Sequence, residues 1–381
     1  MNFDLSEEQR LLADGVRRML EKHYDFEARK RILASAEGWS REAWTRLAEL
    51  GVLGVALGTE HGGFGGGAAD LMGVLEAAGA ALVLEPIVPT IVAGRLLERA
   101  GSAAQRAQWL PALVAGRARL ALATTEASAR NDPQRIETRA QRADGGWRLS
   151  GSKRAVAGGG AADAFLLSAR TDEGLSLFLV PAEAAGLARR ACRLLDGTAG
   201  ADLFFSAARL PLEALVGEPG GALAPLVEAL DFGAALVCAE AVGAMQYACE
   251  ATLEYLKTRR QFGVPIGSFQ ALQHRMVDMT IALEQARSLA CLACSKVDGA
   301  SESAERARAV SLAKIGVNEA ARLVAQEAVQ LHGGMGMTEE LKVSHSFRRL
   351  TALRQQYGDT DGHLARVAAL DAQKEEDNAC R

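Results

Sequence analysis

The stretch FGAALVCAEAVGAMQYAC, residues 232–249, contains a single charged residue, Glu240, and approaches the length of a membrane span. It is rich in alanine and glycine, and charged residues continue the same helical pattern as far as Lys257. Both features are typical of a helix buried inside a protein rather than in lipid. The stretch therefore predicts the first long helix of a helical bundle.

The rest of the C-terminal part has the same helical period. After Gly220, apolar residues recur at intervals of three and four positions. This periodicity predicts helices over 221–258, 268–298, 302–331 and 338–357. Four long helices with short connections are the pattern of an antiparallel bundle.

The N-terminal part is also predicted to be helical. Residues 3 to about 118 show helical periodicity, and Ser6 and Gln9 suit a capping box at the start of the first helix. Further helical patterns surround Trp44 and Leu96.

The central part has a different pattern. From about Leu120 to Gly217, short runs such as GWRLSG, AFLLSAR and LSLFLV are separated by glycine, aspartate and proline turns, which predicts a β-barrel or β-sandwich. The sequence thus predicts a multi-domain α and β protein. Its domains are an N-terminal helical domain (1–119), a central β domain (120–218) and a C-terminal four-helix bundle (219–381).

Composition narrows the possible partners. The chain has 381 residues, 49% of them hydrophobic and 24% charged, as in a folded globular protein. Its 43 basic and 47 acidic residues leave a net charge of −4, which argues against nucleic acid as a partner. The N-terminus MNFDLSEEQR lacks the basic and apolar regions of a secretion signal, so a cytoplasmic protein without membrane insertion is expected. GxGxxG and GxxxxGK[ST] are absent, so neither motif supports a nucleotide-binding α/β domain, and a flavin or nucleotide would have to be held by other means.

The six cysteines are too few and too scattered for a disulfide framework. Cys291 and Cys294 form a CxxC pair, but the pair lies in a helical stretch, and no second pair follows at zinc spacing. We therefore expect free thiols and no metal site.

Glu240 is the first candidate for chemistry. Its neighbours three and four positions away are apolar, so in a helix the carboxylate would project from a stripe of apolar side chains. Burial raises the pKa of a carboxyl group toward the range of a general base. An arginine from a neighbouring helix would satisfy a buried acid equally well, and the sequence leaves both alternatives open.

Two glycine-containing segments are candidates for ligand binding. TRRQFGVPIGSFQ, residues 258–270, interrupts the bundle and presents two arginines that suit a phosphate or pyrophosphate, although arginines at a helix end can also be simply solvated. QLHGGMGM, residues 330–337, follows a helix, and its glycines permit either a helix cap or close approach of a ligand.

Together these two segments resemble the acyl-CoA dehydrogenase family of flavoenzymes, which has an Arg-x-x-Phe-Gly stretch, a Phe-Gln helix start and a Gln-x-x-Gly-Gly turn. The order of helical, β and bundle domains and the start FDLSEEQRLL are similar to that family too. Within it, stretches such as YDFEARKR and CAEAVGAM are most similar to small subunits of bacterial pimeloyl-CoA dehydrogenases.

The resemblance implies FAD, an acyl-CoA substrate, and electron-transferring flavoprotein as electron acceptor, in the catabolism of fatty acids or dicarboxylates. It implies either a homo-oligomer (dimer or tetramer) or a heterotetramer with a second dehydrogenase-like subunit. The product would be a trans-2-enoyl-CoA. The cofactor-binding residues that it implies are Arg259, Phe262, Gln270, Gln330, Gly333 and Gly334, with Thr124 and Thr125 of ATTEAS at the isoalloxazine edge.

Two departures from the family pattern affect the chemistry. The family's catalytic glutamate lies in a Tyr-Glu-Gly-Thr stretch, whereas this chain has glycine at that position, Gly358. The alternative position of the base in some relatives matches Gly233, and Glu240 lies seven residues further on, only roughly 20° short of two full helical turns. We therefore expect Glu240 as the catalytic base, or a base supplied by a partner subunit.

The second departure lies after Lys153, where the family's flavin-facing tryptophan is replaced by alanine. This change keeps a flavin oxidase or monooxygenase on the same fold as a further alternative.

Overall fold

The computed structural model describes residues 6–129, 132–299 and 302–379, and its first part is helical. The capping box predicted at Ser6 and Gln9 is confirmed, with both reciprocal hydrogen bonds present. A second capping box joins Ser102 and Gln105. The helices are α1 (Glu7–His23), α2 (Phe26–Ala34), α3 (Arg41–Glu49), α4 (Ala68–Ala81), α5 (Ile87–Ala100) and α6 (Ala103–Val114), with short 3-10 turns at Val52–Gly54 and Thr59–His61.

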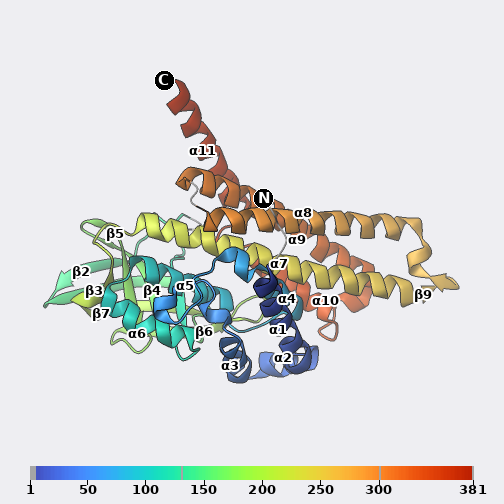
Figure 1. The fold of residues 1–381 in the computed structure, drawn as a ribbon, viewed down its shortest axis with the longest axis horizontal. Coiled ribbons are helices and arrows are strands. Elements are labelled where there is room, and N and C mark those ends of the chain that lie inside the picture. The colour runs from blue at the N-terminus through green and yellow to red at the C-terminus, as the bar shows by residue number, and fades with distance from the viewer. Residues whose placement is uncertain (1–5, 130–131, 300–301, 380–381) are drawn as a thin grey trace. The chain divides into compact units, whose positions relative to one another are not determined.

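The predicted β domain is one eight-stranded sheet with the order β6-β7-β3-β2-β4-β5-β8, in which β1 pairs in parallel with β4. Figure 1 labels β2 to β7 of this sheet. Buried residues such as Trp147 and Phe178, whose rings meet edge to face at 5.2 Å, form its core. The strands are β1 (Leu120–Ala123), β2 (Arg139–Ala143), β3 (Gly146–Ala157), β4 (Ala164–Thr171), β5 (Gly174–Pro181), β6 (Leu187–Arg193), β7 (Ala199–Pro211) and β8 (Leu215–Val216).

The C-terminal part begins with the three long helices that the sequence predicts: α7 (Leu223–Thr258), α8 (Gln270–Asp298) and α9 (Ser303–His332). A small hairpin, β9 (Arg260–Gln261) with β10 (Val264–Pro265), connects α7 to α8. The stretch 232–249 is buried within α7, and no helix in the described part of the chain is long and apolar enough to cross a bilayer.

The helix predicted over 338–357 is wrong in its extent. Helix α10 covers only Lys342–Leu353, and a further helix, α11 (Thr360–Ala379), follows it. Between them the backbone enters the left-handed region at Tyr357 (φ 56°) and Gly358 (φ 110°), which a continuous helix cannot contain.

The chain forms two compact units, each built from segments that are not consecutive in the sequence. One contains residues 1–26, 71–83 and 234–381, and the other contains residues 27–70 and 84–233. We call them the bundle unit and the sheet unit and describe each by itself.

Two glycines allow α4 and α7 to cross closely inside the bundle unit. A Cβ atom on Gly79 would lie 2.0 Å from the Glu240 carbonyl oxygen, and one on Gly243 would lie 1.9 Å from the Glu76 carbonyl oxygen. Real Cβ atoms essentially never come that close to other atoms. The crossing therefore depends on glycine at both positions, and it fixes the turn of α7 that carries Glu240.

Candidate active site

Glu240 is buried and paired with an arginine. Glu240 is 3% exposed, and Arg349 of α10 is 8% exposed. Arg349 donates from Nε to Glu240 Oε1 at 2.7 Å and also from Nη2 to the same oxygen. The structure thus contains the internal ion pair that the sequence left open as an alternative to a general base.

Tyr357 lies within the electrostatic influence of this pair. Burial, together with the nearby Glu240 carboxylate, raises the pKa of the Tyr357 hydroxyl well above its usual value. Tyr357 is therefore neutral and protonated at ordinary pH.

Gly358, at the position of the family's usual glutamate, has no room for a side chain. A Cβ atom there would lie 2.5 Å from Nε2 of His363. His363 is held by contacts of Nδ1 with Ser311 Oγ at 3.0 Å and of Nε2 with the Tyr357 carbonyl at 3.1 Å. Together with the φ of 110°, this packing closes the position to a catalytic side chain.

A buried polar stripe on α9, formed by Ser311, Lys314 and Asn318, holds the break between α10 and α11. Lys314 Nζ donates to Asn318 Oδ1 at 2.8 Å and to the carbonyl of Leu353 at 2.9 Å, and Asn318 Nδ2 donates to the carbonyl of Arg354 at 3.3 Å. The stripe thus satisfies carbonyl groups at the end of α10. The sequence signal was present, because three polar residues recur at helical spacing among mostly apolar residues, but our sequence analysis did not use it.

We expect Lys314 to make stability depend on pH. Burial lowers its pKa from 10.5 to about 8, so between these values the unfolded chain binds a proton that the folded chain does not. The unfolding free energy of the wild type minus that of Lys314→Met should therefore rise by up to about 1.4 kcal/mol per pH unit in that window. Urea denaturation across the window measures it, with exposed Lys257→Met as control. A difference that does not change with pH would contradict the expectation.

The candidate cofactor residues of the bundle unit lie at one end of the bundle. The first segment is the β9–β10 hairpin, which carries Arg259 just before it and Phe262 at its tip; Gln270 begins α8. Phe262 is 91% exposed and meets Phe269 edge to face at 6.1 Å. The Arg259 guanidinium has no hydrogen-bond partner among the described residues, so it is available to a ligand.

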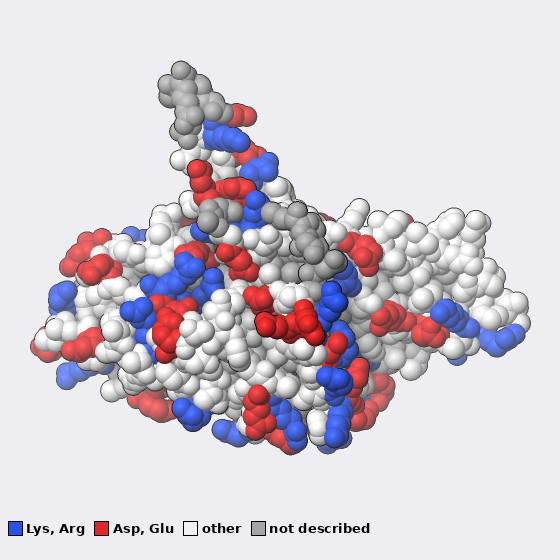
Figure 2. Space-filling model, in the orientation of Figure 1, with Lys and Arg blue, Asp and Glu red and all other residues white. Residues whose placement is uncertain are grey.

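The second segment lies at the end of α9. The ring of Tyr255, near the end of α7, stacks on the ring of His332 at 4.5 Å, which brings the two segments together. Gln330 is exposed, and Cβ atoms on Gly333 and Gly334 would meet nothing within 4 Å. On the face shown in Figure 2, this end of the bundle is largely uncharged, with basic side chains near its tip.

Thr124 and Thr125 belong to the sheet unit and directly follow β1. The amide of Arg154 in β3 donates to the Thr125 carbonyl at 2.9 Å, which fixes this segment against the sheet. Neither threonine hydroxyl has a hydrogen-bond partner in the described part of the chain.

Glu126, the residue after Thr125, forms a buried ion pair with Lys153 of β3. Lys153 Nζ donates to Glu126 Oε1 at 2.6 Å and to Ser168 Oγ at 3.1 Å. Burial lowers the pKa of Lys153 to about 8, although Glu126 opposes this effect. Glu126 also accepts hydrogen bonds from the amides of Glu137 and Thr138, so it ties the end of β1 to the start of β2. Our sequence analysis missed this pair, because its members are 27 residues apart and belong to different strands.

Comparison with known proteins matches nearly the whole chain. The N-terminal, middle and C-terminal domains of acyl-CoA dehydrogenase match residues 6–117, 121–207 and 223–370. The acyl-CoA dehydrogenase FadE12 of Mycobacterium tuberculosis is 31% identical over 340 residues, which cover 86% of this chain and 84% of that protein. The chain belongs to the acyl-CoA dehydrogenase family. Its members depend on FAD in general, and the chain is accordingly an FAD-dependent acyl-CoA dehydrogenase.

Solved structures of the acyl-CoA dehydrogenase fold agree with this assignment. The ChsE4–ChsE5 complex of Mycobacterium tuberculosis contains a chain that is 27% identical with a TM-score of 0.89, covering 98% of this chain and 99% of that one. A structure of an electron transferring flavoprotein of Acidaminococcus fermentans contains a chain that is 27% identical with a TM-score of 0.88, covering 97% of this chain and 98% of that one.

The residues of this acyl-CoA dehydrogenase fit a flavin cofactor. Three residues after Thr125, Ser128 Oγ is buried and has no hydrogen-bond partner among residues 6–129, 132–299 and 302–379, and a ligand could supply one. At the bundle end, the unpartnered Arg259 suits a pyrophosphate and the open space at Gly333 and Gly334 allows a close approach. Among the described cysteines, Cys192, Cys238, Cys249, Cys291 and Cys294 are free as expected; Cys380 lies outside the described residues.

Proposed function

We propose that this chain catalyses the α,β-dehydrogenation of an acyl-CoA thioester to a trans-2-enoyl-CoA and passes the electrons to electron-transferring flavoprotein. One observation carries the proposal. In a chain of this family, the Arg259 hairpin and the Gln330–Gly334 turn lie together at one end of the bundle, joined by the stacked rings of Tyr255 and His332. Arg259, Gln330, Gly333 and Gly334 are exposed, so each segment presents donors or open backbone to a ligand.

The roles of the residues follow from their chemistry. Arg259 would bind the FAD pyrophosphate, Phe262 would pack against the cofactor, and Gln270 would lie nearer its adenosine half. Gln330, Gly333 and Gly334 would contact the cofactor across a subunit interface. Thr124 and Thr125 would donate hydrogen bonds to the isoalloxazine edge. When bound, FAD supplies the acceptor for the hydride that leaves the β-carbon of the substrate.

The α-proton needs a base, and Glu240 is the carboxylate proposed for it. In the structure its Oε1 already accepts two hydrogen bonds from Arg349, and this pairing stabilises the carboxylate and weakens it as a base. Glu240 can act on a substrate only if the pair opens when the thioester binds.

A second candidate is a subunit whose partner supplies the base. Two observations favour it: the Glu240–Arg349 pair, and the closed position at Gly358. The ChsE4–ChsE5 structure, a complex of two proteins, contains a chain of the same fold. In this form of the proposal the chain binds FAD in a heteromer, and its own carboxylates take no part in proton transfer.

Replacing Arg259 by alanine should lower FAD occupancy, because a cation facing the pyrophosphate is lost, and Arg259→Lys should do less harm. Flavin absorbance per protein in the purified variants measures the effect. Arg260→Ala is the matched control, since the Arg260 side chain is already bonded to the carbonyl of Gly263. Full occupancy in Arg259→Ala at an unchanged oligomeric state would contradict the role, and Gln330→Ala tests the second segment in the same way.

Anaerobic flavin bleaching by a panel of acyl-CoA esters tests the whole proposal. Bleaching of the purified chain alone supports the dehydrogenase with its own base. Bleaching only after co-expression with a second dehydrogenase-like subunit supports the partner-dependent form. Flavin-loaded protein that no acyl-CoA bleaches, with or without the second subunit, would contradict both.

A further inference from the structure

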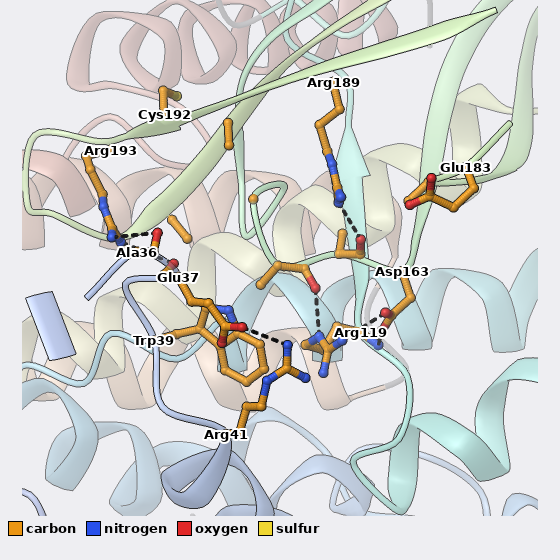
Figure 3. A pocket seen from close by; sticks show the side chains of 16 residues that line it. Ala36, Glu37, Trp39, Arg41, Arg119, Asp163, Glu183, Arg189, Cys192 and Arg193 are labelled. Carbon is orange, nitrogen blue, oxygen red and sulfur yellow. Dashed lines mark hydrogen bonds and ion pairs between the residues drawn. The ribbon is translucent and has the colours of Figure 1, made fainter. Parts of the chain in front are cut away.

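The sheet unit contains a polar pocket that none of the roles above uses. Its volume is about 750 Å³, within the usual range for small-molecule sites. Its walls are the segment 36–41 up to the start of α3, Arg119 just before β1, the turn 160–163, the two residues after β5, β6 and the start of β7 (Figure 3).

Arginines dominate the charged lining of this pocket. Four arginines face three carboxylates there. Arg41 pairs with Glu37 at 2.9 Å, and Arg119 pairs with Asp163 at 2.8 Å. The two other arginines, Arg189 and Arg193, have no carboxylate partner among the described residues.

These two guanidinium groups are held by carbonyl groups. Arg189 donates from Nη1 to the carbonyl of Ala162 at 2.8 Å. Arg193 donates to three successive carbonyls of residues 35–37, at 2.6 to 3.3 Å. Gly38 makes this possible, because a Cβ atom there would fall within 0.9 Å of Arg193 Nη1. The loop is thus shaped around a positive charge that no carboxylate balances.

The two arginines that have carboxylate partners also lie over one aromatic ring. The guanidinium carbons of Arg41 and Arg119 lie 5.1 and 4.7 Å from the ring centroid of Trp39. The Arg119 side chain is only 13% exposed; its Nε and Nη2 are bonded, and Nη1 has no partner among the described residues. Arg41 and Arg189 also have N–H donors that no described residue engages.

We infer that this pocket binds a small organic phosphate. The arginines at the start of α3, just before β1 and in β6 have donors without a partner among the described residues. These donors match the several oxygens of a phosphate group, and the volume leaves room for an attached nucleoside or sugar. Glu183, the lining carboxylate without an ion-pair partner in the described chain, opposes binding and limits the affinity.

Isothermal titration of the purified, flavin-loaded chain with inorganic phosphate, AMP and glutarate tests the inference. We expect saturable binding of AMP, weaker binding of phosphate, and the weakest binding of the dicarboxylate glutarate. Arg189→Gln should weaken AMP binding by about tenfold or more, since a charged donor is lost. Glu183→Gln should strengthen it.

The control variant is Arg190→Gln, because Arg190 is the next residue of β6 and does not line the pocket. It should bind AMP as the wild type does. An excess of free FAD should also leave AMP binding unchanged, which separates this pocket from the proposed flavin site. No saturable binding of AMP, or equal affinity in the wild type and Arg189→Gln, would overturn the inference whether or not the proposed function holds.

Discussion

Gly243→Ala is expected to leave little folded protein. The added Cβ atom would lie 1.9 Å from the carbonyl oxygen of Glu76 and 2.6 Å from its carbonyl carbon, and both are backbone atoms that no side-chain rotation can move. Helices α4 and α7 would have to separate along a buried crossing, at a cost of about 3 kcal/mol or more. Soluble yield and urea denaturation measure the loss.

Two further variants test the cause of this loss. Gly79→Ala meets the Glu240 carbonyl oxygen at 2.0 Å from the other side of the crossing and should cause a similar loss. Gly334→Ala, where the added atom meets nothing within 4 Å, should melt like the wild type. A Gly243→Ala protein with the stability of the Gly334→Ala protein would show that the two helices do not cross as the structure has them.

Local signals were enough to predict most helices. The capping box at Ser6 lies within four residues of sequence, and the period of α7, α8 and α9 is repeated over many turns, so one or two irregular positions do not hide it. The break after α10 depends on Lys314 and Asn318 of α9, which bind carbonyl groups 36 to 39 residues further along the chain. The polar stripe that signals the break therefore lies far from it in the sequence.

The same limit applies to the site residues. Arg259 and Gln330 could be proposed from sequence because each lies in a short glycine-containing segment with its own pattern. The partner of Glu240 could not, because Arg349 is 109 residues away and one of many arginines in the chain. Sequence reasoning identified a buried carboxylate and the kind of partner that would satisfy it, and only the fold identified which arginine it is.

The Glu240–Arg349 pair is the part of the site on which the mechanism depends. Removing one partner of a buried carboxylate–arginine pair is costly, because the remaining charge stays buried and uncompensated. We therefore expect Glu240→Gln to lower the unfolding free energy by about 3–5 kcal/mol. Arg349→Met should cost a similar amount, and the double variant Glu240→Gln, Arg349→Met should recover most of the loss, since neither charge is then left behind.

Flavin reduction by acyl-CoA in the same preparations decides whether Glu240 also acts as a base. Glutamine keeps the size of the side chain and removes its basicity, so loss of a general base would slow reduction by roughly 10²–10⁴-fold in the folded fraction. If a partner subunit supplies the base, Arg349 keeps its hydrogen bonds to the carboxylate, and we expect the stability loss without that collapse in rate. A stable Glu240→Gln protein that holds its flavin but is reduced at a hundredth of the parental rate would contradict this expectation. It would show that the ion pair opens on substrate binding and that Glu240 takes the α-proton.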